Sequence, residues 1–414
     1  MRPLFFNINT FYGIVLSLSI MLLISSCNKD LPDPEPIEYP PVNNSTTSIG
    51  SIISSDTSYS FFKAAAARVG LVNYLSNPDN ISTVFLPNNN AFRVSGIPSA
   101  DVINVLPITT VGAIVQYHIV PGQQYLSADI SDAFPNVQLP TSLTIGTLPG
   151  TTIPIKMSIF PSRRATGMWV NNIPVTSPDH TYQNGVIHEV AAIINPPSQV
   201  LRDALFSNPN LTYFKAALAR ADSGQTGLSR FDSLLNYPVT NMTVLAPNDA
   251  AMQTLLYGSI YGALLAQGAD PATANAQAAF LSSSPDVFSN PLLFPVLTAA
   301  TVRGLLAYHL LASPNPKTGA FEPNIRVFSV NFPPAAATPF FVQTLVNSSV
   351  AIHPGIIVNA TFAGPFVADL KFIGLGTFPP GGGPYSGAPA TAVSMDNHTV
   401  NGVYHVIDKV LLPQ

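Results

Sequence analysis

Four short segments occur twice in this chain, in the same order. An Ala-rich segment, FFKAAAAR, has the partner YFKAALAR, and TVFLPNNNAF has the partner TVLAPNDAAM. YHIV and YHLL follow, and each copy closes with Asn-Gly-Val-x-His, as NGVIH and NGVYH. The separation of partners grows from 152 to 217 residues, so the second copy carries insertions. A unit of this length is a domain and not a solenoid repeat, which predicts two related domains. The pairs begin at residues 61 and 213, 83 and 243, 117 and 308, and 184 and 401.

The Tyr-His segment closes a helical pattern in each copy. Val111, Ile114, Val115 and His118 are spaced i, i+3, i+4 and i+7, and Pro121 follows closely. This spacing puts the four side chains on one face of a helix, and the proline ends the run. The histidine is therefore predicted to lie on the apolar face. The second copy has Val302, Leu305, Leu306 and His309 at the same spacing.

The Asn-Gly-Val-x-His segment alternates as a strand does. Val186, His188 and Val190 share one face of the expected strand. Asn184 and Gly185 just before it are a turn signal, because both residue types tolerate positive φ. The inward-pointing imidazole is expected to keep one fixed hydrogen bond to the backbone, since leaving it unpaired costs about 1 to 3 kcal/mol. The second copy supplies Asn401, Gly402, Val403, His405 and Ile407 at the same places.

The TVFLPN segment predicts a strand followed directly by a helix. Pro87 ends the strand, and Asn88 is placed to cap the helix that starts toward Ala91. Pro247 and Asn248 repeat this arrangement in the second copy.

Composition narrows the class of protein. The chain of 414 residues is 47% hydrophobic and only 9% charged, with a formal net charge of −4. It is therefore globular, and the lack of a Lys/Arg cluster argues against nucleic acid or anionic lipid as an electrostatic partner. Its 40 Pro and 26 Gly residues favour β-structure joined by irregular loops.

The N-terminus has the pattern of an exported lipoprotein. An apolar run over residues 11–24 is too short for a comfortable membrane span and is typical of a secretory signal. The following Ile-Ser-Ser-Cys, ending at Cys27, resembles the bacterial lipobox, in which cleavage leaves the cysteine first and its thiol is diacylglycerylated. Cys27 is the single cysteine, which excludes intrachain disulfides and a Cys-based zinc site. A plain signal peptide with an accidental cysteine is the alternative.

These features divide the chain into four parts. Residues 1–26 are the predicted lipoprotein signal peptide, and residues 27–47 form an acidic, Pro-rich tether. The tether's acidic residues resemble the surface-export signals of Bacteroidetes-type lipoproteins. Residues 48–197 and 198–414 are the two predicted domains, the second with insertions. The expected location is the outer membrane, anchored in lipid through acylated Cys27 and facing the periplasm or the cell exterior.

The order of the four landmarks resembles that of the fasciclin domain, a secreted module of adhesion proteins. Both copies show the Ala-rich helix, T-V-[FL]-x-P-N, Tyr-His and Asn-Gly-Val-x-His, so the resemblance covers roughly residues 48–414. It implies an α+β fold class with two tandem fasciclin-type domains. Each domain would be a β-sandwich wedge with helices packed along one side.

The resemblance also suggests candidate binding residues. In animal fasciclin domains the Tyr-His region and an Asp-Ile pair before Asn-Gly-Val-x-His are implicated in receptor contact. The matching positions are Tyr117, Tyr308, Asp179 and Asp396. The isoleucine is absent, because His180 and Asn397 follow the two aspartates. Integrin-type recognition is therefore not carried over.

Catalysis is not predicted. The sequence lacks a G-x-S-x-G elbow, a P-loop, a G-x-G-x-x-G fingerprint and an H-E-x-x-H helix. The duplicated histidines share their faces with aliphatic residues, so neither a metal nor a cofactor is expected. They are interpreted instead as framework, together with the Asn-Gly pairs: His118, His188, His309, His405, Asn184, Gly185, Asn401 and Gly402.

Two functions remain open. The preferred one is a lipid-anchored adhesion or interaction protein that binds an unknown protein or glycan without turnover. The alternative is an accessory glycan-binding subunit of a polysaccharide uptake system, to which the single Trp169 gives little support. The insertions of the second copy, residues 257–281 and 321–346, are interpreted either as extra packing over its core or as a binding face.

The lipid anchor gives the first prediction. Cys27→Ser should abolish acylation, because the thiol is the atom that the lipid joins. Palmitate labelling and membrane association after cell fractionation measure the effect, and Ser25→Ala, which keeps a small residue two positions before the cysteine, is the control. Unchanged labelling and membrane association in Cys27→Ser would contradict the anchor.

Overall fold

The computed structural model describes residues 45–414, apart from 133–135, 149, 166, 337, 350–351 and 377–384. Cys27, the predicted signal peptide and most of the predicted tether lie outside these residues. The segment Asn44–Gln414 forms one compact unit. Within its described residues no helix is long and apolar enough to cross a membrane. We call residues 48–197 repeat 1 and residues 198–414 repeat 2.

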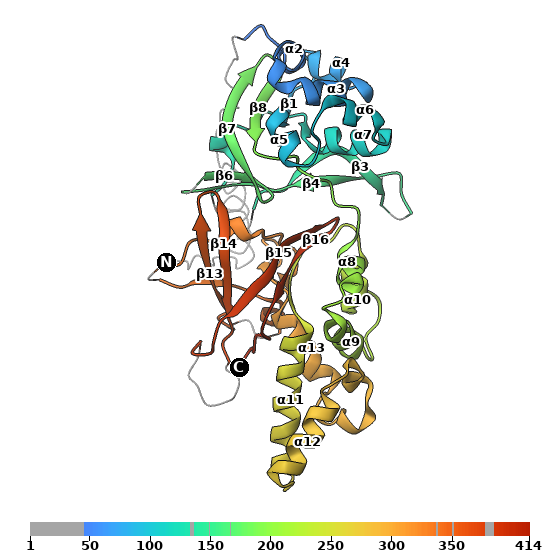
Figure 1. The fold of residues 1–414 in the computed structure, drawn as a ribbon, viewed down its shortest axis with the longest axis vertical. Coiled ribbons are helices and arrows are strands. Elements are labelled where there is room, and N and C mark those ends of the chain that lie inside the picture. Colours follow the sequence, from blue (N-terminus) through green and yellow to red (C-terminus); the bar gives the residue numbers. More distant parts are fainter. Residues whose placement is uncertain are drawn as a thin grey trace, which may run out of the picture. The chain divides into compact units, whose positions relative to one another are not determined.

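Repeat 1 begins with short helices and ends with strands (Figure 1). Its helical elements are α2 (Ile49–Ser55), η2 (Thr57–Tyr59), α3 (Ser60–Arg68), α4 (Val72–Ser76), α5 (Asn89–Val94), α6 (Ala100–Val105), α7 (Ile108–Tyr117) and η3 (Ser127–Asp129). Its strands are β1 (Ser82–Pro87), β2 (Ile119–Pro121), β3 (Leu139–Thr147), β4 (Pro154–Ile159), β5 (Pro161–Arg164), β6 (Gly167–Val170), β7 (Ile173–Tyr182) and β8 (Gly185–Val190).

Repeat 2 follows the same order with additions. Its helical elements are α8 (Leu201–Ser207), α9 (Thr212–Ala221), η4 (Gly227–Ser229), α10 (Phe231–Asn236), α11 (Asp249–Ala266), α12 (Pro271–Leu281), η5 (Pro285–Ser289), η6 (Pro291–Leu293), α13 (Ala299–Tyr308), η7 (Ser329–Asn331) and η8 (Leu345–Ser348). Its strands are β9 (Met242–Pro247), β10 (Ser313–Pro314), β11 (Phe321–Glu322), β12 (Phe340–Val342), β13 (Ile356–Ala363), β14 (Phe366–Ile373), β15 (Ala390–Thr399) and β16 (Gly402–Ile407).

Each repeat contains a six-stranded sheet in which its first and last long strands are parallel neighbours. The sheet of repeat 1 has the order β2-β1-β8-β7-β6-β5, and that of repeat 2 has the order β12-β13-β14-β15-β16-β9. β1 pairs in parallel with β8, and β9 pairs in parallel with β16, whereas the other described pairs within these two sheets are antiparallel. The beginning and end of each repeat are therefore joined at one place.

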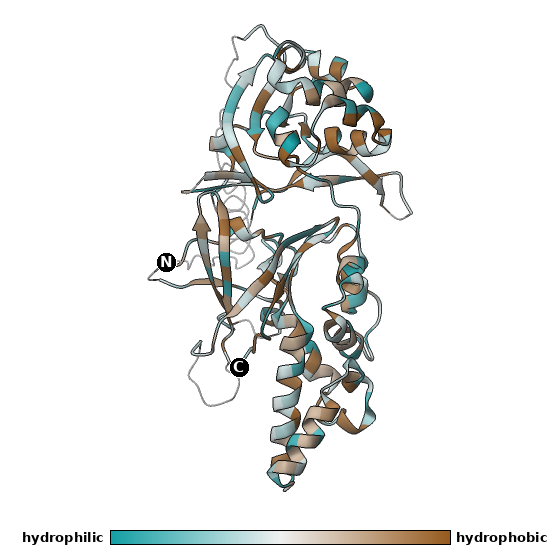
Figure 2. Cartoon of the chain, viewed as in Figure 1, coloured by the Kyte–Doolittle hydropathy of each residue, from teal (hydrophilic) through white to brown (hydrophobic). Residues whose placement is uncertain are grey.

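The first strand of each repeat is buried on both faces. Val84 and Leu86 of β1 pack with the helices of repeat 1, while Phe85 packs with residues of the β3–β4 hairpin. In repeat 2, Val244 packs with the helices and Leu245 with the sheet side of the core. This arrangement has the helices on one side of a strand layer, as expected from the resemblance. Figure 2 shows apolar residues over much of the strands and helices of both repeats.

The predicted strand-to-helix junction is confirmed in both repeats. The Asn88 side chain accepts a hydrogen bond from the Ala91 N–H, and Asn248 accepts one from the Ala251 N–H. An N-cap of this kind satisfies a backbone donor that the helix cannot pair, which contributes about 1 kcal/mol.

The insertions differ between the two predicted segments. Residues 257–281 contribute to two helices, because α11 begins before the insertion, after the Asn248 cap, and α12 begins at Pro271, after the Asp270 cap. Residues 321–346 form short strands and 3-10 turns, and Ile325, Val327 and Phe332 of this segment are buried in the core of repeat 2. The second insertion thus serves largely as packing.

The repeats also bury side chains against each other. Phe160 and Trp169 of repeat 1 form one cluster with Phe328, Val330 and Val403 of repeat 2. The Trp169 Nε1–H donates to the Pro365 carbonyl oxygen at 2.8 Å. The two predicted domains are therefore in apolar contact, and the boundary between residues 197 and 198 stays a prediction.

Candidate functional site

The Asn-Gly pair is a buried junction and not only a turn. The Asn184 side chain is fully buried, and its Oδ1 accepts a hydrogen bond of 2.8 Å from the Ile49 N–H at the start of α2. Its Nδ2 donates to the carbonyl oxygens of Leu75 and Asn77, at 2.8 and 3.1 Å. One amide thus joins the first helix, the end of α4 and the start of β8.

Asn401 makes the same junction in repeat 2. Its Oδ1 accepts from the Leu201 N–H at 2.7 Å, and its Nδ2 donates to the Leu235 and Tyr237 carbonyl oxygens, both at 2.9 Å. Asn184 and Asn401 are not among the residues with positive φ, so the expectation that asparagine is present for its backbone freedom is wrong. It is needed because its amide both accepts and donates.

The glycine of the pair allows a close backbone approach. Gly185 has φ +136°, and a Cβ there would lie 1.8 Å from the Ser82 carbonyl oxygen on β1. At Gly402, a Cβ would lie 2.6 Å from the Met242 carbonyl oxygen on β9. Only glycine fits at these distances, because the parallel strands begin to pair at this point.

His118 and His309 use both ring nitrogens in bonds to the backbone. His118 Nε2 accepts from the Ile194 N–H at 3.0 Å, so its Nδ1 carries the proton and donates to the Ile114 carbonyl oxygen at 2.7 Å. His309 does the same with Leu411 at 3.0 Å and Leu305 at 2.8 Å. Each histidine fastens the end of a helix to the C-terminal segment of its repeat. Burial lowers the pKa of each imidazole to about 4.

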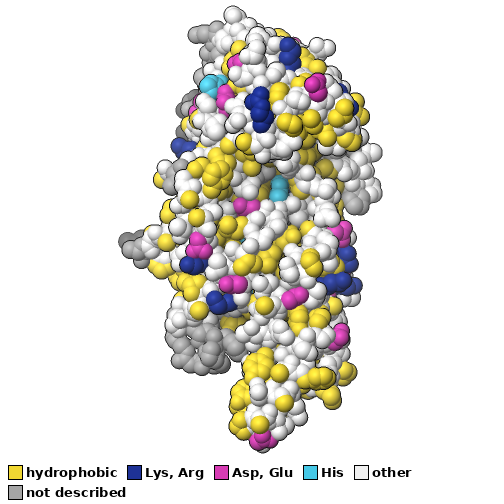
Figure 3. Space-filling model, viewed as in Figure 1, with side chains coloured by type: hydrophobic (Ala, Val, Ile, Leu, Met, Phe, Trp, Pro, Cys, Tyr) yellow, Lys and Arg dark blue, Asp and Glu magenta, His cyan; other side chains and the backbone are white. Residues whose placement is uncertain are grey.

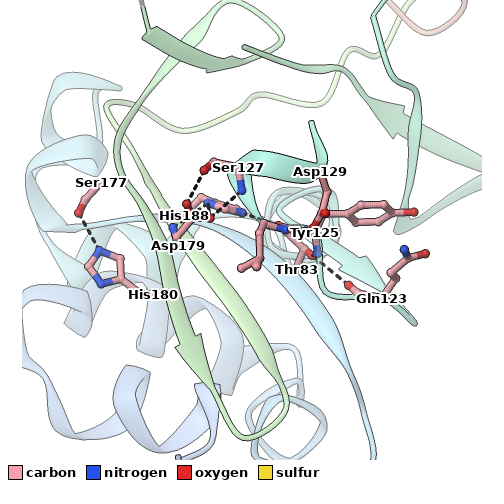
Figure 4. A network of polar contacts seen from close by, with 10 residues as sticks. Thr83, Gln123, Tyr125, Ser127, Asp129, Ser177, Asp179, His180 and His188 are labelled. Carbon is pink, nitrogen blue, oxygen red and sulfur yellow. Dashed lines mark hydrogen bonds and ion pairs between the residues drawn. The ribbon is translucent and has the colours of Figure 1, made fainter. Parts of the chain in front are cut away.

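His188 and His405 belong to a second duplicated network, and Figure 4 shows its copy in repeat 1. His188 Nε2 donates to the Tyr125 carbonyl oxygen at 2.8 Å, and its Nδ1 accepts from the Asp179 N–H at 3.2 Å. The Asp179 carboxylate accepts hydrogen bonds from the Ser127 N–H, at 2.7 Å, and from the Ser127 hydroxyl. The network therefore fixes the turn at η3 against the β7–β8 hairpin.

Repeat 2 contains the same network. The Asp396 carboxylate accepts from the Ser329 N–H and hydroxyl, both at 2.6 Å, and the Asp396 N–H donates to His405 Nδ1 at 3.4 Å. His405 Nε2 contacts the Val327 carbonyl oxygen at 3.1 Å. Asp179 and Asp396 have φ of +66° and +57°, which is strained for a side chain other than glycine and is held by these bonds.

These two networks engage both aspartates that the sequence suggested as binding residues. Asp179 and Asp396 hold serine turns of their own chain, so their carboxylates are already engaged. The Ser127 and Ser329 hydroxyls bond to the aspartates and not to the histidines, so His188 and His405 are not placed as bases for these two serines. Within the part of the chain that the structure describes, no three His, Cys, Asp or Glu side chains could hold a metal ion together.

The two candidate tyrosines do not lie on the surface. Tyr117 and Tyr308 are both fully buried. The Tyr117 hydroxyl donates to the Ser158 carbonyl oxygen at 3.0 Å, and the Tyr308 hydroxyl donates to that of Gly355 at 2.7 Å. Burial raises the pKa of Tyr117 to about 12. The prediction that these rings form a binding surface is therefore wrong, because each ring packs between a helix and a strand layer.

Comparisons with known proteins agree with this framework. Residues 57–196 match the profile of the fasciclin domain. The fasciclin-like arabinogalactan protein of Arthroderma benhamiae is 26% identical over 156 residues, which is 38% of this chain, and the match spans 32% of that relative. A FAS1 domain pair from the insect cell adhesion molecule fasciclin I aligns over 87% of this chain and 98% of its own, at 15% identity and a TM-score of 0.30.

Repeat 1 therefore matches the fasciclin domain over most of its length. Repeat 2 has the same order of shared elements, the same parallel strand pair and the same asparagine and histidine bonds. The fold is therefore that of two tandem fasciclin-type domains, as predicted from the four landmarks.

The buried histidines predict a loss of stability in acid. Free imidazole has a pKa of about 6.5 in an unfolded chain, whereas burial holds His118 and His309 near 4. The neutral imidazoles contribute their full stabilisation of the folded state above pH 6.5. This stabilisation is lost as the pH falls from 6.5 through 4, because in that range the unfolded chain binds more protons than the folded chain. Each should lower the free energy of unfolding by up to about 3 kcal/mol below pH 4.

Denaturant unfolding measured from pH 7.5 to pH 4 tests this expectation. His118→Gln should be less stable at pH 7.5 and should show a shallower loss in acid. His180→Gln is the matched control, because it leaves both buried histidines in place. An acid loss of equal slope in wild type and His118→Gln would contradict the assignment.

Proposed function

We propose that this chain is an adhesion or interaction protein that is anchored in the outer membrane through acylated Cys27. It presents its two fasciclin domains to the periplasm or the cell exterior and binds a protein or glycan ligand without catalysis. The observation that carries the proposal is that the duplicated polar residues are used within the fold. Ligand binding then resides on surface that the framework does not use.

The helical insertion of repeat 2 is the favoured surface. Phe280 near the end of α12 is 78% exposed, and Leu265 near the end of α11 is also exposed. On the facing side, Ala274 and Ala278 of α12 are buried, and the Tyr257 hydroxyl donates to Asn275 Oδ1 at 2.5 Å. The hairpin is thus packed internally while it presents apolar side chains outward, which is typical of an interaction surface.

The distribution of charged side chains favours a ligand that binds without strong electrostatic attraction. Figure 3 shows few charged side chains on the visible face, and in places a Lys or Arg side chain lies next to an Asp or Glu side chain. The match of repeat 1 to the fasciclin domain favours the same class of function. A glycan-binding accessory subunit has less support, because Trp169 is fully buried and cannot stack on a sugar ring.

Adhesion of beads coated with the full chain tests the proposal. Phe280→Ser should reduce adhesion several-fold and leave the melting temperature unchanged, since the side chain is mostly exposed. Val105→Ser is the matched control, because Val105 of repeat 1 is 81% exposed and lies outside the insertion.

The outcome separates three cases. Loss of adhesion in Phe280→Ser alone supports the insertion as the binding surface. Equal loss in both variants would assign adhesion to general surface apolarity and contradict the insertion. Wild-type protein that adheres to nothing and turns over a glycan or an ester would contradict the whole proposal.

A further inference from the structure

A groove of about 610 Å³ lies among the helices of repeat 2. Its lining comes from α9, from the end of α8 with the loop between these helices, and from η5. Ala216 and Ala219 of α9 and the buried ring of Phe288 from η5 give the lining an apolar part. Every described residue of the lining belongs to repeat 2, so the groove does not depend on the contact between the repeats. We call it the α9–η5 groove.

Lys215 and Arg220 are the cations of the α9–η5 groove. They are five residues apart on α9, and each residue of a helix advances by about 100° around the axis and by about 1.5 Å along it. Ala216 and Ala219 therefore lie between the two cations on the same side of the helix. Asp286 of η5 is the acidic residue of the described lining, so the lining has a net charge of +1 (2 − 1). The groove thus combines an apolar part with an excess of positive charge.

These two cations have no ion-pair partner, unlike the others in this part of the chain. Residues 201–308 are all described and contain five Lys or Arg residues. Three of the five form ion pairs with aspartates: Arg202, Arg230 and Arg303. Lys215 and Arg220 are in no ion pair with a described Asp or Glu residue. The cations that remain available to an outside anion are therefore both in the groove.

Both cations are accessible to a ligand. Lys215 is exposed, and its ammonium lies 5.3 Å from the centroid of the Phe206 ring. The guanidinium of Arg220 lies over Phe294, with Cζ 3.7 Å from the ring centroid, and its Nε–H donates to the Leu297 carbonyl oxygen at 2.8 Å. Its two Nη atoms donate to no described residue and are not among the buried atoms that lack a partner, so they face solvent. A guanidinium that is fixed in this way is suited to bind a carboxylate.

An acidic peptide suits this groove better than an acidic sugar does. Arg202 and Lys215 both lie over the Phe206 ring, with Cζ 4.6 Å and Nζ 5.3 Å from its centroid. The other aromatic ring of the lining, that of Phe288, is buried. Neither ring is therefore open to stack on a sugar. An aliphatic side chain would bury apolar surface against the alanines, and carboxylates beside it would reach the two cations.

We propose that the α9–η5 groove binds an acidic peptide segment of a partner protein. Carboxylates of the peptide pair with Lys215 and Arg220, and an aliphatic side chain packs on the alanines between them. The groove is a second binding site, separate from the adhesive surface around Phe280, because no residue of α11 or α12 belongs to its described lining.

Selection from a random peptide library displayed on phage provides the probe. Peptides that bind the immobilised full chain are kept, and those that also bind Ala219→Trp are discarded, because the tryptophan fills the groove without changing any charge. Ala219 is exposed on α9, so this variant should keep the wild-type melting temperature. The retained peptides should be rich in Asp and Glu next to aliphatic residues.

Titration of a labelled synthetic copy of a retained peptide into the full chain, followed by fluorescence anisotropy, measures the role of each charge. Lys215→Gln should weaken binding about fivefold, because it removes one partner of the carboxylates. Asp286→Asn should tighten binding about twofold, because it removes a like charge from the groove. Lys317→Gln, which removes an exposed cation of repeat 2 outside the groove, is the matched control and should bind like wild type.

The remaining outcomes separate this site from the adhesive surface and from a glycan site. Phe280→Ser should bind the peptide like wild type, whatever its effect on adhesion. An equal loss of peptide binding in Phe280→Ser would place the peptide on the α11–α12 hairpin and contradict the proposal. The proposal would also fail if no peptide is retained or if the retained peptides are not acidic. Trigalacturonate that displaces the peptide and binds more tightly would make the ligand an acidic glycan and overturn it.

Discussion

A single buried asparagine amide holds each repeat closed. Asn184 accepts from the first helix and donates to the loop after α4, while its backbone begins the strand that pairs with β1. Asn401 does the same in repeat 2. Every other feature of the framework depends on this junction, because it brings the start and end of the repeat together. An apolar side chain in place of Asn184 would leave the Ile49 N–H and the Leu75 carbonyl oxygen buried and unpaired, each at a cost of about 1 to 3 kcal/mol.

The histidines add further hydrogen bonds between segments of each repeat. His118 joins the end of α7 to Ile194, and His188 joins β8 to the loop before η3. Both nitrogens of each ring are engaged, and burial lowers the pKa of both rings, so they serve as neutral spacers with fixed tautomers. The same bonds in repeat 2 show that duplication preserved an architecture. Both histidines of each repeat are therefore engaged within the fold.

The sequence predicted local features better than tertiary ones. The Asn88 cap followed from spacing alone, because such features depend on neighbours in the chain. The burial of Tyr117 was missed because it was interpreted through the resemblance, although the residue ends a helix whose apolar face packs against the strands. The groove beside Lys215 and Arg220 gave no sequence signal, since part of its lining comes from residues 285–289. Only the fold brings these groups together.

The most direct test of this account is the equilibrium urea unfolding of Asn184→Ala in the full chain. The account predicts a loss of at least about 2 kcal/mol in the free energy of unfolding, because two buried backbone groups lose their partner. Asn73→Ala, at an exposed position of α4, is the matched control and should change the free energy by less than about 0.5 kcal/mol. A change of that small size in Asn184→Ala, with loss of ligand binding in its place, would contradict the account and make the Asn-Gly-Val-x-His motif a binding site.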